Sequence, residues 1–271
     1  DGTTLTNSGI VQITNSDNTV TIQGDVGGIA RFSGTDIDYN SLDLTIARLQ
    51  YDPAMTLAAS EDVTFTGDSE LAATLTLAGS SSITISGCTL NASTINNSGT
   101  IYLNGTTAAA TLSLDNGTTL TNSGVVQISN SDNTVTLQGD AGGTATYTGT
   151  DIDYNSLGIT LSLLIYNPAV ALGASEGITL GGAVTFASTV TLNGAGATLT
   201  TGAYTLTGQD TLTNTNGLIT ISNSGAIDLG SNTFSNGSSV TSNGALTCGD
   251  FTTTGTYSNN AGSVITTSGN V

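Results

Sequence analysis

The sequence predicts an all-β protein, a parallel β-solenoid (β-helix) built from a duplicated unit of 115 residues. Three observations predict this fold. A long stretch is repeated almost word for word, short runs alternate apolar and polar residues with a period of two, and turns rich in Gly and Asn separate these runs. Short repeated strands without helices are typical of solenoids, in which each coil stacks on the previous one.

The repeat begins at Gly2 as GTTLTNSGIVQITNSDNTVTIQGD and returns at Gly117 as GTTLTNSGVVQISNSDNTVTLQGD. The offset of 115 residues holds without a gap through the later motifs GTDIDYNSL and YDPA, which return as GTDIDYNSL and YNPA. A third copy opens at Asn236. Because the chain starts and stops inside a repeat, we expect it to be processed or part of something longer. We predict one continuous solenoid over residues 1–271, with internal repeats at 2–115 and 117–235 and a partial third copy at 236–271.

The predicted strands are short and end at turns in which Asn and Gly tolerate positive φ. Polar Asn and Ser side chains at these corners can form ladders with their copies in the coils above and below. At about 20 residues per coil, the chain would form about 13 coils and span about 60 Å. The DIDYNSL segment does not match the plain coil pattern, so we expect an insertion or a wider coil there. A β-sandwich or a pair of Ig-like domains is the alternative; the lack of tryptophan and of a linker between copies argues against it. The predicted strand segments are 4–13, 19–24, 73–79, 82–87, 93–103, 111–117, 189–194, 197–202, 203–208, 211–221 and 222–230, while 41–51 and 156–166 are predicted to be strand or irregular.

The amino-acid composition argues against several classes of binding partner. Only 8% of residues are charged, the net charge is −18, and Arg31 and Arg48 are the only cations. An acidic chain without a basic patch repels phosphate backbones and anionic lipid surfaces, so we expect no nucleic acid as partner. No window approaches the run of about 18 apolar residues that a transmembrane helix needs, so we also expect no membrane insertion.

Several coils share the degenerate pattern L-x-N-x-G-x-I: LTNSGIVQI, INNSGTIYL, LTNSGVVQI and LTNTNGLITI. These segments resemble the coil repeats of the filamentous-haemagglutinin and autotransporter-adhesin class. The resemblance implies a right-handed parallel β-helix that is secreted and displayed on a bacterial surface. It covers most of the chain and carries no functional residues across.

Two copies of DIDYN form the candidate metal site. D-x-D-x-N presents three oxygen ligands on one side of an extended turn, as at the opening of a calcium loop, and calcium is therefore a candidate cofactor. The continuation differs from an EF-hand, since serine stands at position six and glutamate is missing at position twelve. The alternative is a solvated acidic corner whose side chains bond their own backbone. The candidate ligands are Asp36, Asp38, Asn40, Asp151, Asp153 and Asn155, with Asp25 and Asp140 as possible additions from a neighbouring coil.

Two further surfaces suggest a binding module for glycan or ice. Thr-x-Thr recurs, and rows of threonine on a flat face resemble ice-binding arrays; the alternative is that threonine is simply a good strand residue on an exposed face. Four tyrosines could line a groove for glycan, although packing in the core or at a coil edge is the simpler reading. The pairs are Thr19/Thr21, Thr74/Thr76, Thr134/Thr136 and Thr189/Thr191, and the tyrosines are Tyr39, Tyr51, Tyr154 and Tyr166.

Neither the cysteines nor the carboxylates indicate catalysis. Cys88 and Cys248 share the parity of inward-facing residues, and we expect both to be small core side chains rather than a disulfide. The chain has no histidine and no lysine, and both arginines are replaced in the second copy, by Thr146 and Leu163. A carbohydrate-active β-helix would need paired carboxylates in a cleft, and nothing in the sequence singles out such a pair.

The sequence therefore predicts a non-enzymatic structural protein. We expect an extracellular or cell-surface solenoid that forms a fibre or an adhesin shaft. Open solenoid ends are unpaired strand edges, which invite pairing with another chain. The expected partner is thus the protein itself, stacked end to end as a homopolymer, or the rest of a larger repeat protein.

Overall fold

A computed structural model describes residues 3–13, 20–26, 28–40, 42–260 and 262–270 of the chain. None of these residues lies in a helix, and the described strands pair in parallel within stacked coils. This confirms the all-β parallel solenoid, whereas the β-sandwich alternative, which rests on antiparallel sheets, is wrong. The chain separates into two compact units, residues 1–145 and 146–271, and each is described by itself.

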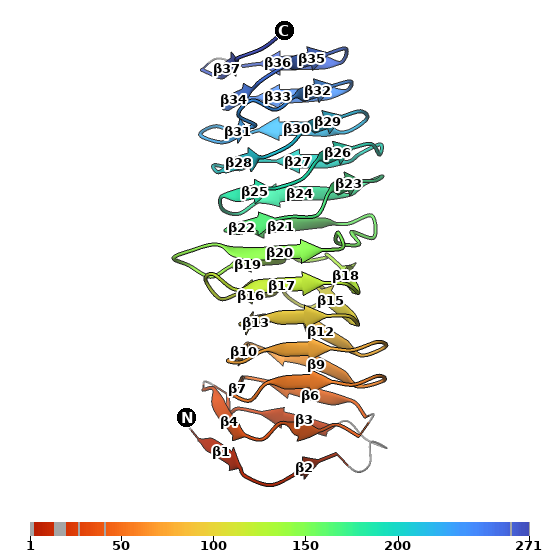
Figure 1. The fold of residues 1–271 in the computed structure, drawn as a ribbon, viewed down its shortest axis with the longest axis vertical. Coiled ribbons are helices and arrows are strands. Elements are labelled where there is room, and N and C mark those ends of the chain that lie inside the picture. Colours follow the sequence, from red (N-terminus) through yellow and green to blue (C-terminus); the bar gives the residue numbers. More distant parts are fainter. Residues whose placement is uncertain (1–2, 14–19, 27, 41, 261, 271) are drawn as a thin grey trace. The chain divides into compact units, whose positions relative to one another are not determined.

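In unit 1 each coil passes through three faces (Figure 1). The first face contains β1 (Thr4–Asn7), β4 (Ala30–Gly34), β7 (Leu49–Tyr51), β10 (Ser69–Leu71), β13 (Thr89–Ala92), β16 (Ala110–Leu114) and β19 (Val135–Gly139). The second contains β8 (Met55–Leu57), β11 (Leu75–Leu77), β14 (Ile95–Asn97) and β17 (Thr119–Asn122). The third contains β3 (Val20–Gln23), β6 (Leu44–Ala47), β9 (Asp62–Gly67), β12 (Ser82–Ser86), β15 (Thr100–Asn104) and β18 (Val125–Asn130), while β2 (Val11–Gln12) pairs with β5 (Ile37–Asp38) in a separate short ladder.

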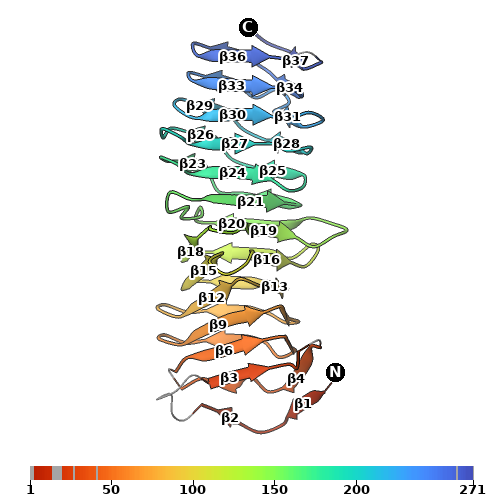
Figure 2. The same ribbon diagram turned by 180° about the vertical axis from the view of Figure 1, so that it is seen from behind.

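Unit 2 repeats the three-faced arrangement, seen from behind in Figure 2. Its first face contains β21 (Gly158–Ser162), β24 (Gly177–Leu180), β27 (Thr198–Thr200), β30 (Leu218–Ile221), β33 (Ser239–Ser242) and β36 (Thr256–Asn259). The second contains β22 (Leu164–Tyr166), β25 (Val184–Phe186), β28 (Thr205–Gly208), β31 (Ala226–Asp228), β34 (Ala245–Cys248) and β37 (Val264–Thr267). The third contains β23 (Val170–Leu172), β26 (Val190–Leu192), β29 (Leu212–Asn214), β32 (Phe234–Asn236) and β35 (Phe251–Thr253); β20 (Ala145–Gly149) spans the boundary between the units in the sequence.

The coils are close to the predicted length. On the first face of unit 2, paired residues are 17 to 21 positions apart in the chain. In unit 1, Ala30 pairs with Leu49, so the coil that contains DIDYNSL is of ordinary length. The expected insertion or wider coil is therefore wrong: the segment turns a corner and contributes the two-residue strand β5. Ser41, within this segment, and Thr19, at the start of another predicted strand, lie outside the described residues.

The core is a set of apolar columns that run from coil to coil. In the third-face sheet of unit 1, every second residue points inward and is paired with an apolar residue in the next coil. Because side chains alternate across a strand, the residues between them face outward. Both free cysteines are buried, which confirms the expectation that they pack in the core. One such column is Val20, Leu44, Val63, Ile83, Ile101 and Val126.

The repeat does not contain a whole number of coils. β1 and β17 share the sequence TLTN at an offset of 115 residues, yet β1 belongs to the first face of unit 1 and β17 to its second face. Likewise β3 lies on the third face, and its counterpart β19 lies on the first. The first copy of the repeat therefore advances by five coils and one further face.

Candidate functional site

The first DIDYN corner is split between the interior and the solvent. Ile37 and Tyr39 are buried, whereas Asp38 and Asn40 are exposed. Asp36 is half-buried at the start of β5. Asn40 has a φ of 50°, the left-handed conformation that asparagine tolerates at a corner. The alternation of a strand thus places the hydrophobic residues of this motif in the core and its outer polar residues in water.

Asp36 is a structural acceptor. Its Oδ1 accepts a hydrogen bond from the Tyr51 hydroxyl and one of 2.9 Å from the backbone N–H of Ile37, while its Oδ2 accepts one of 2.9 Å from the N–H of Thr56. Burial raises the pKa of Asp36, and these hydrogen bonds oppose the rise. Burial also raises the pKa of Tyr51, so its hydroxyl stays protonated and acts as a donor. The carboxylate therefore links the corner to strands β7 and β8 of the next coil.

The second copy of the motif forms the same contact between its first aspartate and a later tyrosine. The Tyr166 hydroxyl donates to Asp151 Oδ1 at 2.5 Å and accepts from the N–H of Ile152 at 3.1 Å. The Tyr154 hydroxyl also donates to Asp151 Oδ1, at 3.3 Å. Burial raises the pKa of Asp151, against hydrogen bonds from Tyr166 and two backbone N–H groups. We call each hydrogen-bonded aspartate and tyrosine an Asp–Tyr pair; the two pairs are Asp36–Tyr51 and Asp151–Tyr166.

The Asp–Tyr pairs were not predicted, although the sequence contains a signal for them. DIDY and Y[DN]PA recur together at the same spacing in both copies. All four tyrosines of these motifs are at most 2% exposed, which confirms core packing and leaves no groove lined by them. Tyr51 stacks on Phe32 with ring centroids 4.9 Å apart, and Tyr166 stacks on Tyr147 at 4.8 Å.

The predicted calcium ligands point in different directions. Asp38 faces solvent, where its Oδ2 accepts from Gln12 Nε2 at 2.8 Å and its Oδ1 accepts from the N–H of Asn40 at 3.2 Å. Asp153 and Asn155 are exposed in the same way, and Asp153 Oδ1 accepts from the N–H of Asn155 at 3.1 Å. Among the described residues, no group of three or more His, Cys, Asp or Glu side chains is placed to hold a metal ion.

The geometry leads to a prediction for calcium. Because Asp36 and Asp151 already accept hydrogen bonds from N–H and O–H donors, they have little capacity left for a cation. We expect the thermal midpoint of the protein to be the same in calcium and in EGTA, measured by circular dichroism. A calcium-dependent rise that is lost in Asp38→Asn or Asp153→Asn would contradict this and support a calcium site at the corners.

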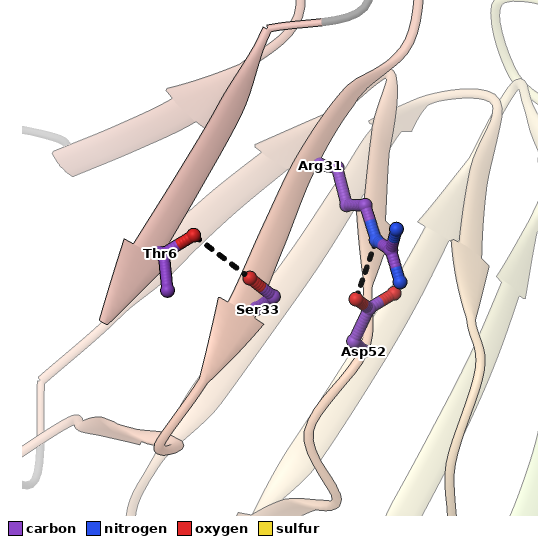
Figure 3. Close-up of polar contacts among 4 residues, drawn as sticks. All are labelled: Thr6, Arg31, Ser33 and Asp52. Carbon is purple, nitrogen blue, oxygen red and sulfur yellow. Dashed lines mark hydrogen bonds and ion pairs between the residues drawn. The ribbon is translucent and has the colours of Figure 1, made fainter. Parts of the chain in front are cut away.

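Both arginines form polar contacts between the first coils of unit 1. Arg31 on β4 donates from Nε to Asp52 Oδ2 at 2.5 Å, and beside it Ser33 donates to Thr6 on β1 at 3.3 Å (Figure 3). Arg48, in the left-handed conformation with a φ of 53°, donates to the carbonyl oxygens of Gly24 and Asp25. An exposed ion pair of this kind stabilises a protein by about 1 kcal/mol or less.

Buried asparagines form ladders between coils. Asn97 donates to Asn122 Oδ1 at 2.8 Å and to the carbonyl of Val125 at 2.9 Å. In unit 2, Asn214 donates to Asn236 Oδ1 at 2.9 Å and to the carbonyl of Ser239 at 3.0 Å. In each case the donor lies in the earlier coil, and the two acceptors lie three residues apart in the next. This confirms the expected pairing of asparagines with their copies above and below.

Unit 2 presents a neutral threonine column on its first face. Successive strands pair these threonines directly. The adjacent outward column contains only Gly, Thr, Leu and Ser, so both columns are uncharged. Of the predicted Thr-x-Thr pairs, Thr76, Thr136 and Thr191 lie on β11, β19 and β26, so these pairs do not form this column. It consists of Thr160, Thr179, Thr200, Thr220 and Thr241, and it continues with Ser258.

Comparisons with known proteins give no family to which the chain can be assigned. No protein-family model, curated protein or solved structure matches the chain. The likeness to filamentous-haemagglutinin coils therefore stays a prediction. The part of the chain that the structure describes contains no helix long and apolar enough to span a membrane.

Proposed function

We propose that the protein is a non-enzymatic structural solenoid that acts outside the cell, as the shaft of a surface fibre or adhesin, and associates with itself end to end. One contrast carries the proposal. Leu5 on β1 is 55% exposed, whereas Leu120, at the same position of the identical strand β17, is 0% exposed. β17 is covered by β14, but β1 has a described partner only on its β4 side. An uncovered strand with an exposed apolar side chain is a surface that favours pairing with another chain.

The internal chemistry supports a structural role. Aspartate, tyrosine and asparagine side chains that often serve in active sites here bond neighbouring coils, as in Asp36–Tyr51 and Asn97–Asn122. Such contacts stiffen the stack, since buried polar groups with their partners in place resist rearrangement. The scarcity of charged residues and the absence of lysine leave few sites for trypsin-like proteases, which suits an extracellular shaft.

The test is negative-stain electron microscopy of the purified protein and of two leucine variants. We expect the wild type to form long uniform fibres and Leu5→Asp to remain as single rods, because the charge would be buried against the next copy. Leu218→Asp is the matched control: Leu218 is 41% exposed on β30, away from any strand edge, so this variant should still form fibres.

Single rods for the wild type would overturn self-association. They would favour the alternative, a module that binds ice or glycan, for which the threonine column of unit 2 is the supporting observation. Fibres from both aspartate variants would show that assembly uses another surface. The less favoured alternative, a carbohydrate-active enzyme, would need a convergent pair of carboxylates.

A further inference from the structure

Strand β36 carries the side-chain pattern that a covering strand for β1 would need. Inside unit 1, β14 covers β17 in parallel, with Ile95 opposite Leu120, Asn96 opposite Thr121 and Asn97 opposite Asn122. The covering strand thus has a large apolar residue, a polar residue and an asparagine. β36 has the same order, in Tyr257, Ser258 and Asn259.

We propose that copies of the protein stack head to tail through one defined register, in which β36 of one copy pairs in parallel with β1 of the next. Tyr257 lies opposite Leu5, Ser258 opposite Thr6 and Asn259 opposite Asn7. This inference rests on the self-association proposed above and names the strands that carry it. The contact joins two different surfaces, so it is heterologous, and it builds a filament when the rotation between copies does not close a ring.

Among the described residues, each of these two strands has one side without a paired strand. In the described part of the chain, β36 pairs with β33 on one side only, as β1 pairs only with β4. Thr6, Ser258 and Asn259 are exposed. Parallel addition of a strand to an open sheet edge gains main-chain hydrogen bonds along its length.

The asparagine ladder sets the register. Asn97 and Asn214 each donate to an asparagine in the following coil and to a carbonyl three residues further on. In the proposed stack, Asn259 would donate in the same way to Asn7 Oδ1 and to the carbonyl of Ile10. Within the described residues, Asn7 Oδ1 accepts one hydrogen bond, of 3.0 Å from the N–H of Gly9, and an amide oxygen has two lone pairs.

The first coils also carry larger exposed apolar side chains than their repeat counterparts. Ile10, Val26 and Ile29 are 82%, 87% and 50% exposed, and the second copy has Val125, Ala141 and Thr144 at these positions. A hollow of about 320 Å³ beside Leu5, lined in part by Ile22, Phe32 and Leu49, is not filled by side chains of the described residues. Unfilled apolar space and exposed apolar residues at one place favour a covering partner.

Disulfide trapping tests the register. Thr6→Cys and Ser258→Cys are placed in a Cys88→Ala, Cys248→Ala background. Paired parallel strands lie about 4.8 Å apart, within the Cα separation of about 4.4–6.8 Å that a disulfide needs. On oxidation with diamide, which accepts the two thiol hydrogens, we expect a ladder of covalent oligomers on a non-reducing gel. Separate Thr6→Cys and Ser258→Cys proteins should cross-link only when mixed.

The control pair is Thr4→Cys with Ser258→Cys, which is displaced by two residues, or about 6.6 Å along the strand. An equal ladder from this pair, while fibres still form, would overturn the register and leave self-association intact. Cross-linking of Thr6→Cys with itself would overturn the head-to-tail polarity. No ladder from any pair together with no fibres would overturn both the register and the proposed function.

Discussion

Leu120→Ala is expected to destabilise unit 1 by about 2–5 kcal/mol, whereas Leu5→Ala should cost about 1 kcal/mol or less in the isolated protein. The two residues occupy the same position in identical TLTN strands. Leu120 is 0% exposed opposite Ile95, while Leu5 is 55% exposed. The difference therefore isolates the effect of a covering coil on one side chain.

Hydrogen exchange suits this comparison better than a single melting curve. Solenoids unfold locally, because each coil contacts mainly its neighbours, so the loss should be read from the amides of β14, β17 and β18 for Leu120→Ala. In fibres the effect of Leu5→Ala should be larger, because Leu5 would then be covered by the next copy. We expect this variant to raise the critical concentration for assembly about 5- to 30-fold. Equal losses for both variants in the isolated protein would contradict the open state of β1.

Much of the fold could be predicted because it depends on local patterns. Alternation of apolar and polar residues predicted most of the strands. The segment SLDLTIARLQY, predicted to be strand or irregular, contains strands β6 (Leu44–Ala47) and β7 (Leu49–Tyr51). The inward positions of Cys88 and Cys248 followed from the same parity. Asparagine ladders followed from the repetition of corner residues, since equivalent corners in successive coils must lie side by side.

The direction of the DIDYN side chains could not be predicted in this way. Parity alone places Asp36, Asp38 and Asn40 on one side of an extended turn, which is the geometry that suggested calcium. The Asp36 carboxylate instead bonds Tyr51, 15 residues later, and Thr56, 20 residues later. Which tyrosine meets which aspartate depends on the number of residues in the intervening coil, and a strand pattern does not reveal that number.

Coil length also explains why the phase of the duplication was missed. Equivalent strands lie on different faces of unit 1, as β1 and β17 do, because 115 residues make five coils and one further face. The offset of 115 residues gives the separation of two equivalent segments in the sequence, but it does not show which face of the solenoid each segment occupies. Only the paired register of the strands shows that β14 covers β17. The side-chain pattern proposed for a strand that covers β1 is taken from that pair.

Tyr166→Phe is expected to destabilise unit 2 by about 1.5–3 kcal/mol at neutral pH, the usual contribution of a hydrogen bond to a charged group. Tyr166 is 0% exposed, and its hydroxyl is the donor to Asp151 Oδ1. Phenylalanine keeps the stack on Tyr147, which has an interplanar angle of 3°, and removes the hydroxyl that donates to Asp151 and accepts from the N–H of Ile152. Tyr204→Phe is the matched control, since Tyr204 is 43% exposed in the same unit, and it should change stability by about 0.5 kcal/mol or less.

The loss should depend on pH with a definite sign. Burial raises the pKa of Asp151 above the value of 3.8 expected in the unfolded chain. Between these two pKa values the folded state holds more protons than the unfolded state, so the contribution of Asp151 to stability is greatest below pH 3.8 and falls as the pH rises through the folded-state pKa. The Tyr166 hydrogen bond lowers that pKa by favouring the charged carboxylate, and Tyr166→Phe should therefore steepen the fall.

At about pH 3 the carboxyl group is protonated in both states, and the cost of Tyr166→Phe should shrink to about 0.5–1.5 kcal/mol, as for a neutral hydrogen bond. Denaturation of wild type, Tyr166→Phe and Tyr204→Phe at pH 3 and pH 7 measures both costs. A loss that is the same at the two pH values would mean that Asp151 is not the charged acceptor of this bond. A loss confined to neutral pH would identify the Asp–Tyr pair as a contact whose strength depends on the charge of a partly buried carboxylate.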